Sequence, residues 1–401
     1  MEQTRSPILA SAPTHALLNT STVFNSEIRM KTTVSLIKAD IGSIPGHVVV
    51  PKPLLDIAEA RMAEAKETGL INSYYVFHAG DDTELLMTHN RGEDNEDIHR
   101  LAWDTFMACA DKAKKMKLHG AGQDLLADAF SGNIKGMGPG YAEMEFEERG
   151  SEPIVLYAAD KTEPAAFNYL FYKVFADPGN TAGLVIDPRI NCGFSFEVLD
   201  GLHNRSVTLS TPDELYSLLA LIGATERYMI KRITRNDDGA LAAASSTTKI
   251  NYIAGKYVGK DDPVCMFRAQ SGFPSVGEIT SPFLHTYMVA GWMRGSHWAP
   301  FFPVGLKDSR CTLFDGPPRI VGLGVQICNG ELTSDDEGNP IVVDLFSDPS
   351  FDLAREEALQ MASYMRRHGT FQPARLGPGA MEYTTLPQVL ADLEHRFVDE
   401  D

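Results

Sequence analysis

Apolar residues in this chain fall into short runs and longer periodic stretches that alternate along its length. Segments 33–39, 74–78 and 85–89 are short and largely apolar, which predicts three β-strands, the last two forming a hairpin. Segments 52–68 and 95–117 repeat apolar residues every three or four positions, which predicts two amphipathic helices. The first part of the chain is therefore expected to be a mixed α/β structure.

The rest of the chain continues the same mixture. Further strands are predicted at 142–147, 154–159, 228–233 and 264–268. Further helices are predicted at 211–222 with Thr211 as N-cap, at 352–368, and from 387 to about 397.

Residues 1–29 differ from everything that follows. They are rich in Ser and Thr, show no periodicity, and lack the apolar segment of a secretory signal. We therefore expect a disordered extension here. No repeat and no low-complexity linker interrupts residues 30–401, so we expect one large domain there.

Composition narrows the possible partners and the compartment. The 401 residues carry a formal net charge of −18, which argues against binding to a nucleic-acid backbone. No apolar run reaches the length of about 18 residues that a membrane-spanning helix needs. The five cysteines form no CxxC pair, which argues against a zinc site or a disulfide framework and favours reduced thiols in a cytoplasm.

Carboxylates follow several of the predicted strands. Asp40 closes the first strand, Asp81 and Asp82 lie at the predicted hairpin, and Asp160 closes the strand at 154–159. Sites in α/β proteins gather at strand ends, and hard carboxylate oxygens suit Mg²⁺. Aspartate is also a common strand terminator and turn residue. Its repetition at three separate places favours a shared metal cluster.

Residues 256–263 concentrate the most reactive groups of the chain. An amine, two carboxylates and a phenol stand close together as Tyr257, Lys260, Asp261 and Asp262. Adjacent carboxylates repel one another, and a single lysine cannot neutralise both, so these acids also point to a metal. In an extended segment Lys260 and Asp262 would share one face. The alternative is a solvated surface turn without a function.

Known phosphate motifs are incomplete, although several loops suit anions. Gly259-Lys260 has neither the first glycine nor the Ser or Thr of a P-loop. Segments 131–133 and 136–140 are glycine-rich, so their backbone N–H groups can cradle an anion. Arg294 stands between two glycines, which favours a bidentate contact with phosphate.

Nine stretches taken together resemble a known family from Met30 to about Phe397. They read KTTVSLIKADIGSIPGH, HAGDDTELLMTH, GAGQDLL, FSGNIKGMGPG, ADKTEP, AGKYVGKDDP, GWMRGSH, FDGPPR and MEYTTLP. In this order they resemble the bifunctional fructose-1,6-bisphosphate aldolase/phosphatases of archaea and some bacteria.

This resemblance implies a fold, an activity and an assembly. The implied fold is a layered α-β-β-α sandwich, and the implied assembly is a cytoplasmic homo-octamer. The implied gluconeogenic activity joins dihydroxyacetone phosphate to glyceraldehyde 3-phosphate through a lysine Schiff base. It then hydrolyses the 1-phosphate in the same pocket with several Mg²⁺ ions. The implied partners are small sugar phosphates, with neither nucleic acid nor membrane.

The resemblance also implies roles for individual residues. Lys260 corresponds to the Schiff-base lysine, and Tyr257 to the group that moves protons. The implied metal ligands are Asp40, Asp81, Asp82, Gln123, Asp160, Asp261 and Asp262. The implied substrate contacts are His47, His119, Gly132, Asn133, Lys161, Gln270, Arg294, Asp315 and Tyr383.

Two departures and two alternatives accompany this hypothesis. His119 stands where the family often has a tyrosine that contacts substrate, and the extension 1–29 is foreign to the family pattern. One alternative is a Mg²⁺-dependent sugar phosphatase in which Lys260 only binds phosphate. The other is a sugar-phosphate sensor without catalysis, which the intact set of acids, Lys260 and Tyr257 disfavours.

Overall fold

The computed structural model describes residues 30–125, 138–246, 261–290, 298–313, 316–367 and 383–400. Its α-helices are α1 (Lys52–Glu67), α2 (Glu96–Lys115), α3 (Asn168–Ala176), α4 (Gly183–Ile186), α5 (Leu215–Ile222), α7 (Val276–Thr280), α8 (Asp352–Arg367) and α9 (Leu386–Leu393). Its longer strands are β1 (Lys31–Asp40), β2 (Ser73–Ala79), β3 (Asp82–His89), β4 (Gly140–Glu147), β5 (Glu152–Asp160), β6 (Phe194–Asp200), β7 (Arg205–Ser210), β8 (Tyr228–Arg235), β9 (Leu241–Ser245), β10 (Val264–Arg268) and β14 (Arg319–Cys328). Its short strands are β11 (Met288–Ala290), β12 (Trp298–Pro300), β13 (Phe302–Pro303), β15 (Glu331–Leu332), β16 (Val343–Asp344) and β17 (Val398–Asp399).

Four strands form a small antiparallel sheet in the order β2-β3-β1-β4. The predicted hairpin is confirmed, because β2 pairs with β3 in antiparallel register. Both faces of β1 are buried, with Val34 and Leu36 on one side and Ile37 and Ala39 on the other. A strand that is buried on both faces explains the apolar run seen in its sequence.

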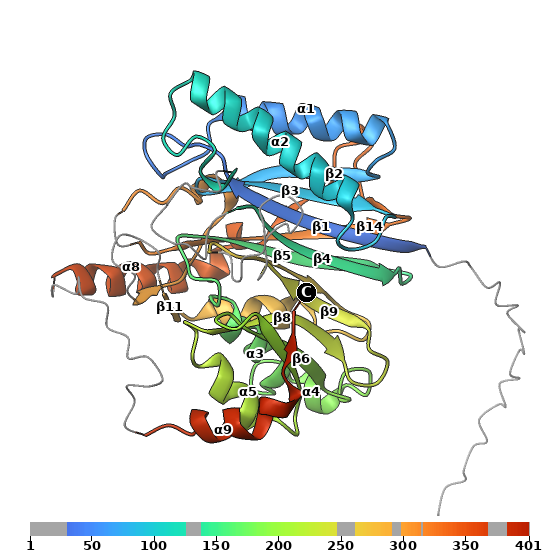
Figure 1. The fold of residues 1–401 in the computed structure, drawn as a ribbon, viewed down its shortest axis with the longest axis vertical. Coiled ribbons are helices and arrows are strands. Elements are labelled where there is room, and N and C mark those ends of the chain that lie inside the picture. The colour runs from blue at the N-terminus through green and yellow to red at the C-terminus, as the bar shows by residue number, and fades with distance from the viewer. Residues whose placement is uncertain are drawn as a thin grey trace, which may run out of the picture.

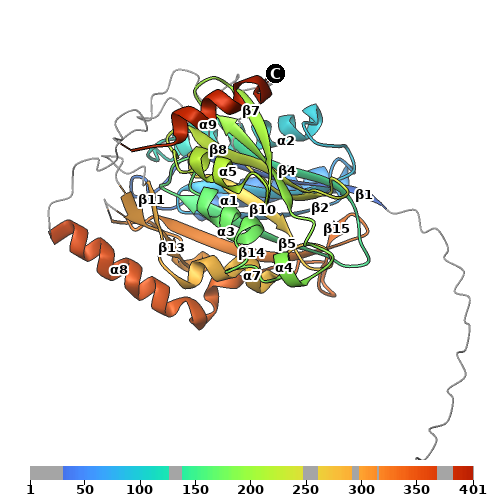
Figure 2. The same cartoon turned by 90° about the horizontal axis from the view of Figure 1, so that it is seen from below.

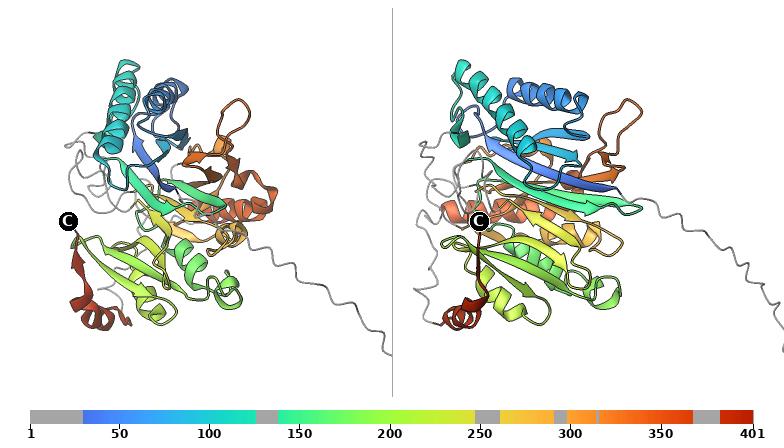
Figure 3. Two further views of the ribbon diagram at one scale, coloured as in Figure 1. Left: turned by 90° about the vertical axis from the view of Figure 1, so that its right-hand side faces the viewer. Right: turned by 45° about the vertical axis from the view of Figure 1, so that its right-hand side comes forward.

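A larger sheet of eleven strands lies beneath the small one, and β14, β5 and β10 run through its first half. The faces of the two sheets meet in a core to which Leu36, Leu156, Met266 and Leu323 contribute. Helices α1 and α2 cover the outer face of the small sheet, while α3 and α5 cover the large one (Figures 1 and 3). The predicted α-β-β-α sandwich is confirmed as a single domain.

The two long helices of the upper layer form where the periodicity predicted them. In α1 the buried positions Leu54, Ala58, Met62 and Ala65 follow one face at helical spacing. In α2 the Asn95 side chain accepts hydrogen bonds from two backbone N–H groups of the first turn. Acidic residues at the start of α2 and lysines at its end also stabilise the helix, because their charges interact favourably with the helix dipole.

The predicted start of the helix at 211–222 is wrong. Helix α5 begins at Leu215, and the Thr211 hydroxyl donates to the carbonyl of Phe194 instead of capping the helix. The Glu214 carboxylate accepts a hydrogen bond from the backbone N–H of Ser210, four residues earlier. Contacts with the neighbouring strand β6 therefore override the local capping signal.

The lower layer also contains α9, which packs against α5 (Figure 2). Helix α8 lies apart from both layers, alongside β12 and β13. Among the described helices, none combines the length and the apolar character that crossing a lipid bilayer requires.

Candidate active site

Three strands bring carboxylates to one edge of the sandwich. Asp40 is the last residue of β1 and lies opposite Asp82, the first residue of β3. Asp81 lies in the turn that joins β2 to β3, and Asp160 ends β5 in the other sheet. Asp262 precedes β10, which pairs with β5. We call Asp40, Asp81, Asp82, Asp160 and Asp262 the acidic edge.

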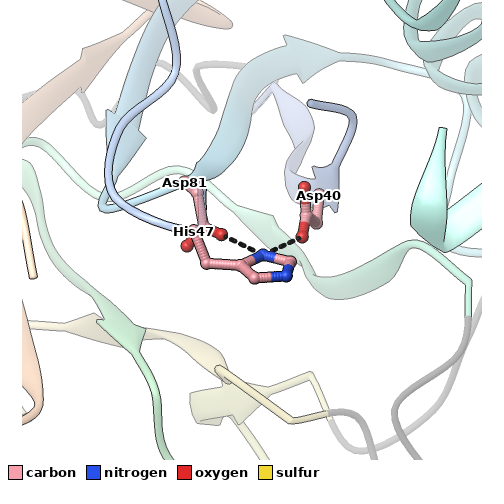
Figure 4. Close-up of side chains that lie close together, drawn as sticks. All are labelled: Asp40, His47 and Asp81. Carbon is pink, nitrogen blue, oxygen red and sulfur yellow. Dashed lines mark hydrogen bonds and ion pairs between the residues drawn. The ribbon is translucent and has the colours of Figure 1, made fainter. Parts of the chain in front are cut away.

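His47 holds one half of the acidic edge together (Figure 4). Its Nδ1 lies 2.9 Å from Asp81 Oδ2 and 3.5 Å from Asp40 Oδ2. These two carboxylates raise the pKa of His47 to about 10, so its ring is a cation at neutral pH. Its Nε2 lies 3.0 Å from Nε2 of His119, which therefore accepts the second proton of the ring.

Lys161 joins the two sheets at this edge. Its Nζ makes ion pairs with Asp81 and with Asp160, the latter at 2.6 Å. Burial disfavours the charged amine, but the two carboxylates hold the pKa of Lys161 well above its usual range. Burial also opposes the ionisation of Asp81, yet Lys161 and His47 hold its pKa below the usual range.

One ammonium cannot balance both carboxylates that it touches. Burial raises the pKa of Asp160 well above its usual range, and the charges of Asp81 and Asp262 add to the effect of burial. Burial, reinforced by the charge of Asp81, likewise raises the pKa of Asp40 to about 7. Among the described residues, the acidic edge is therefore short of positive charge.

The other half of the acidic edge is held by backbone and by a buried lysine. Lys38 pairs with Asp82 at 2.5 Å, and both side chains are almost fully buried. The backbone N–H of Thr162 donates to Asp262 Oδ1 at 2.7 Å. Oxygens of Asp82, Asp160 and Asp262 lie within 4.8 Å of one another, a spacing that can hold a metal ion.

Two buried carboxylate oxygens fit a missing cation. Asp40 Oδ1 and Asp160 Oδ2 are buried and have no hydrogen-bond partner among the described residues. Buried carboxylate oxygens normally have partners, so these two oxygens are suited to an ion. Hard oxygen donors favour Mg²⁺ over softer transition metals.

The structure brings most of the described site residues together. The Gln123 side chain lies beside Gly120, as do Asp40 and His47. Asp261 directly precedes Asp262 and is half-buried. Six predicted residues lie outside the described part of the chain: Tyr257, Lys260, Gly132, Asn133, Arg294 and Asp315.

Two predicted substrate contacts lie away from the acidic edge. Gln270 follows Arg268 at the far end of β10, whereas Asp262 precedes the near end of that strand. Five residues of strand span about 16 Å, too far for one side chain to bridge. Tyr383 is 84% exposed and lies just before α9, in the lower layer.

Asp262 does not adopt the extended conformation in which it would share one face with Lys260. Its φ angle is 49°, and β10 begins only at Val264. A left-handed residue turns the chain, so alternation of side chains does not apply across it. Its N–H donates to the carbonyl of Thr162, which fixes this turn against the end of β5.

Three residues that support the site escaped the sequence analysis. Lys38 neutralises Asp82, Asp124 accepts a hydrogen bond from the backbone N–H of Asp40, and Gly80 packs directly against the Asp160 carboxylate. A side chain at Gly80 would collide with that carboxylate. Of these three residues, only Lys38 could have been found from the sequence. It lies inside an apolar strand, and lysine is almost never buried unless it is paired.

Comparison with known proteins identifies the family. A family model described as fructose-1,6-bisphosphatase matches residues 31–398. A fructose-1,6-bisphosphate aldolase/phosphatase of Ignicoccus hospitalis is 58% identical over 367 residues, which cover 92% of this chain and 93% of that protein. Proteins of the same name from Methanothermobacter marburgensis and Moorella thermoacetica are 53% and 55% identical; the matches cover 93% and 92% of this chain and 100% and 95% of those proteins. The chain therefore belongs to the fructose-1,6-bisphosphatase family that includes these aldolase/phosphatases.

Proposed function

We propose that this chain is a bifunctional gluconeogenic enzyme that works in one pocket. It condenses dihydroxyacetone phosphate with glyceraldehyde 3-phosphate to fructose 1,6-bisphosphate, and then hydrolyses the 1-phosphate to give fructose 6-phosphate and phosphate. Family membership supports both activities. The observation that carries the phosphatase step is the pair of buried, unpartnered oxygens on Asp40 and Asp160.

Several Mg²⁺ ions are the proposed cofactors. The proposed ligands are Asp40, Asp81, Asp82, Gln123, Asp160, Asp261 and Asp262. When bound, Mg²⁺ supplies polarisation of the phosphoryl group and a more acidic water molecule. The deficit of positive charge at the acidic edge supports this proposal.

Lys161 and His47 bind the phosphoryl group in the proposed reaction. Both side chains carry positive charge here, and both contact Asp81. Phosphate oxygens accept charge-assisted hydrogen bonds from such donors. With cations bound to these carboxylates, the Lys161 amine would be available to donate a hydrogen bond to the substrate.

Lys260 forms the Schiff base with dihydroxyacetone phosphate, and Tyr257 moves the protons of the aldol step. An imine requires a neutral amine, and a free lysine has a pKa near 10.4. The neighbouring Asp261 and Asp262 would raise that pKa further, whereas cations on those acids reverse the local field.

A homo-octamer completes the proposed site. The remaining proposed substrate contacts are His119, Gly132, Asn133, Gln270, Arg294, Asp315 and Tyr383. Gln270 lies too far from Asp262 in one copy, so it can reach an acidic edge only from a neighbouring copy. Exposed apolar side chains on α8, including Leu353, Leu359 and Tyr364, support association.

The proposed catalytic domain is formed by residues 30–401, and residues 1–29 are proposed to lie outside it. The family match begins at Lys31, which supports this division. All five cysteines are free thiols, which supports the proposed cytoplasmic location. A variant that starts at Met30 should retain both activities. Loss of both activities from a folded Met30 variant would show that the extension belongs to the enzyme.

Borohydride trapping tests the aldolase step and separates it from a simple phosphatase. Wild-type enzyme with dihydroxyacetone phosphate and borohydride should gain one covalent adduct, located at Lys260 by peptide mass spectrometry. Lys260→Arg keeps the charge but cannot form an imine, so it should lose the adduct and the condensation while still hydrolysing fructose 1,6-bisphosphate. Full aldolase activity in Lys260→Arg would contradict the Schiff base and favour the phosphatase-only alternative.

A further inference from the structure

A basic cavity lies outside the acidic edge, between α8 and the strands β13 and β14 of the large sheet. It has a volume of about 540 Å³, within the range of small-molecule sites, and Phe302, Arg319 and Arg355 are among the residues that line it. Figure 2 shows α8 alongside β13 and β14, the elements that frame it. None of the residues proposed for catalysis or substrate binding lines this cavity.

The charge of this cavity is opposite to that of the whole chain. Four basic side chains line it against two acidic ones, although the chain carries a net charge of −18. Arg355 and Asp352 pair with each other at 2.5 Å. The three remaining cations, Lys307, Arg310 and Arg319, therefore face one acid, Asp308.

Arg319 is the central feature of the cavity. Its guanidinium lies 4.4 Å from the centre of the Phe302 ring, and its Nε donates to the backbone carbonyl of Arg310. No carboxylate in the described part of the chain comes within 4.0 Å of the nitrogens of Arg319, Arg310 or Lys307. Burial lowers the pKa of Arg319, as expected for a desolvated cation without a close counter-charge.

Partial burial of an arginine side chain costs free energy when its N–H groups have no acceptor, and Arg319 has only one acceptor among the described residues. A bound anion would offset that cost. The planar guanidinium suits the paired oxygens of a phosphoryl group, and the two rim cations, Lys307 and Arg310, add charge where solvent enters. We propose that this cavity, the Arg319 pocket, binds a small phosphorylated metabolite. This site is separate from the proposed catalytic site.

The paired strands β14 and β5 connect the Arg319 pocket to the acidic edge. Arg319 on β14 is directly opposite Asp160 on β5. The cation on Arg319 opposes the binding of other cations nearby, so an anion in the pocket reduces that repulsion. Bound anion should therefore tighten Mg²⁺ binding, and Mg²⁺ should tighten anion binding by the same factor.

Tungstate, a phosphate mimic with strong anomalous scattering, locates the site directly. Crystals of the Mg²⁺-loaded enzyme soaked in tungstate should show a peak among Arg319, Arg310 and Lys307, in addition to any peak at the acidic edge. Absence of a peak in the Arg319 pocket would overturn the proposal. A peak there with none at the acidic edge would support the pocket while counting against the proposed catalytic function.

Calorimetric titration with inorganic phosphate tests the site in solution. Wild-type enzyme should bind one more phosphate per chain than Arg319→Gln does. Arg310→Gln removes only an exposed rim charge, so it should keep the fold and weaken the binding of that phosphate by about fivefold, as expected for the loss of one solvent-exposed charge pair. Lys112→Gln, an exposed lysine on α2, is the matched control and should bind like wild type. Equal stoichiometry in wild type and Arg319→Gln would refute the Arg319 pocket.

Discussion

The small sheet contributes to two clusters of polar residues, which differ in how their buried carboxylates are satisfied. At one end is the acidic edge. Farther along the same sheet, beneath α2, Ser35, His89, His99, Glu143 and Asp94 form a second cluster, which we call the Glu143 network. Both contain acids and a histidine at a spacing that can hold a metal ion.

The Glu143 network is a chain of donors that ends on a carboxylate. The backbone N–H of Arg91 donates to His89 Nδ1, and His89 Nε2 lies 2.8 Å from the Ser35 hydroxyl. Ser35 donates to Glu143 Oε1 at 2.6 Å, and the Asp94 N–H donates to Oε2 at 2.7 Å. Both oxygens of Glu143 therefore have protein partners.

The two clusters consequently shift their carboxyl groups in opposite directions. Burial opposes the ionisation of Glu143, but hydrogen bonds led by His99 lower its pKa. Burial, with the charge of Asp81, raises the pKa values of Asp40 and Asp160, and each also has one oxygen without a donor in the described structure. The comparison therefore separates Glu143, whose two oxygens the fold satisfies, from two acids that each keep a buried oxygen suited to a cation.

Replacing an unsatisfied acid gives the largest expected effect on activity. Asp40→Asn should lower phosphatase activity by about 100-fold or more, since even residues that only support metal ligands are worth about 10- to 100-fold. The metal-free variant should melt at the same temperature as wild type or higher, because a poorly solvated charge is removed. Activity assays and thermal melts in EDTA test both parts. A lower melting temperature in EDTA would place Asp40 with the structural acids.

The pH dependence of stability should separate the two clusters in metal-free protein. Asp40 holds its proton until about pH 7 when folded but only to about pH 3.8 when unfolded, so its contribution to stability is lost as pH rises through that window. His47 acts in the same direction, because its stabilisation is full below pH 6.5 and is lost towards about pH 10. Glu143, whose pKa is lowered, stays ionised above pH 5 and adds no slope there.

The free energy of unfolding in EDTA should therefore fall between pH 5 and pH 8, by up to about 3 kcal/mol through Asp40 and about 2 kcal/mol through His47, the latter reduced by solvent screening. Asp160, whose pKa is also raised, adds to the fall. Urea titrations at several pH values measure it. Asp40→Asn should flatten the slope, and saturating Mg²⁺ should reverse it because metal ligands must lose their protons. A metal-free wild type that gains stability over this range would contradict the assignment of Asp40.

Replacing the satisfied acid should affect stability before activity. Glu143→Gln removes charge from three hydrogen bonds and should cost about 2 kcal/mol of folding stability, with activity retained in the folded fraction. Glu145→Gln is the control on the same strand, because Glu145 pairs with the exposed Lys31 and should matter by less than about 1 kcal/mol. Equal melting temperatures for the two variants would show that burial of Glu143 contributes little.

The local sequence pattern predicted which strands carry acids of the acidic edge, but not which other side chains lie near those acids. Asp40 and Asp160 were found because each ends an apolar strand, and the observed β1 and β5 do end there. Lys38 contacts Asp82, 44 residues away in the sequence, only because β1 pairs with β3. The register of that pairing could not be inferred from a single sequence. The far position of Gln270 likewise depends on the antiparallel pairing of β10 with β5, which places Val264 near the end of β5 and Arg268 near its start.

The smallest expected effect is at His119, on the rim of the acidic edge. His119 accepts the outer proton of His47, which is itself tied to Asp81 by its inner nitrogen. His119→Phe removes one hydrogen bond at a half-exposed position, worth about 1 kcal/mol, so KM for fructose 1,6-bisphosphate should rise about fivefold with kcat little changed. His119→Gln retains an acceptor and should restore most of the loss. If His119→Phe instead lowers kcat as far as Asp40→Asn does, then His119 acts on the reacting groups themselves. The distinction between acids that hold the ions and side chains that only orient His47 would then fail.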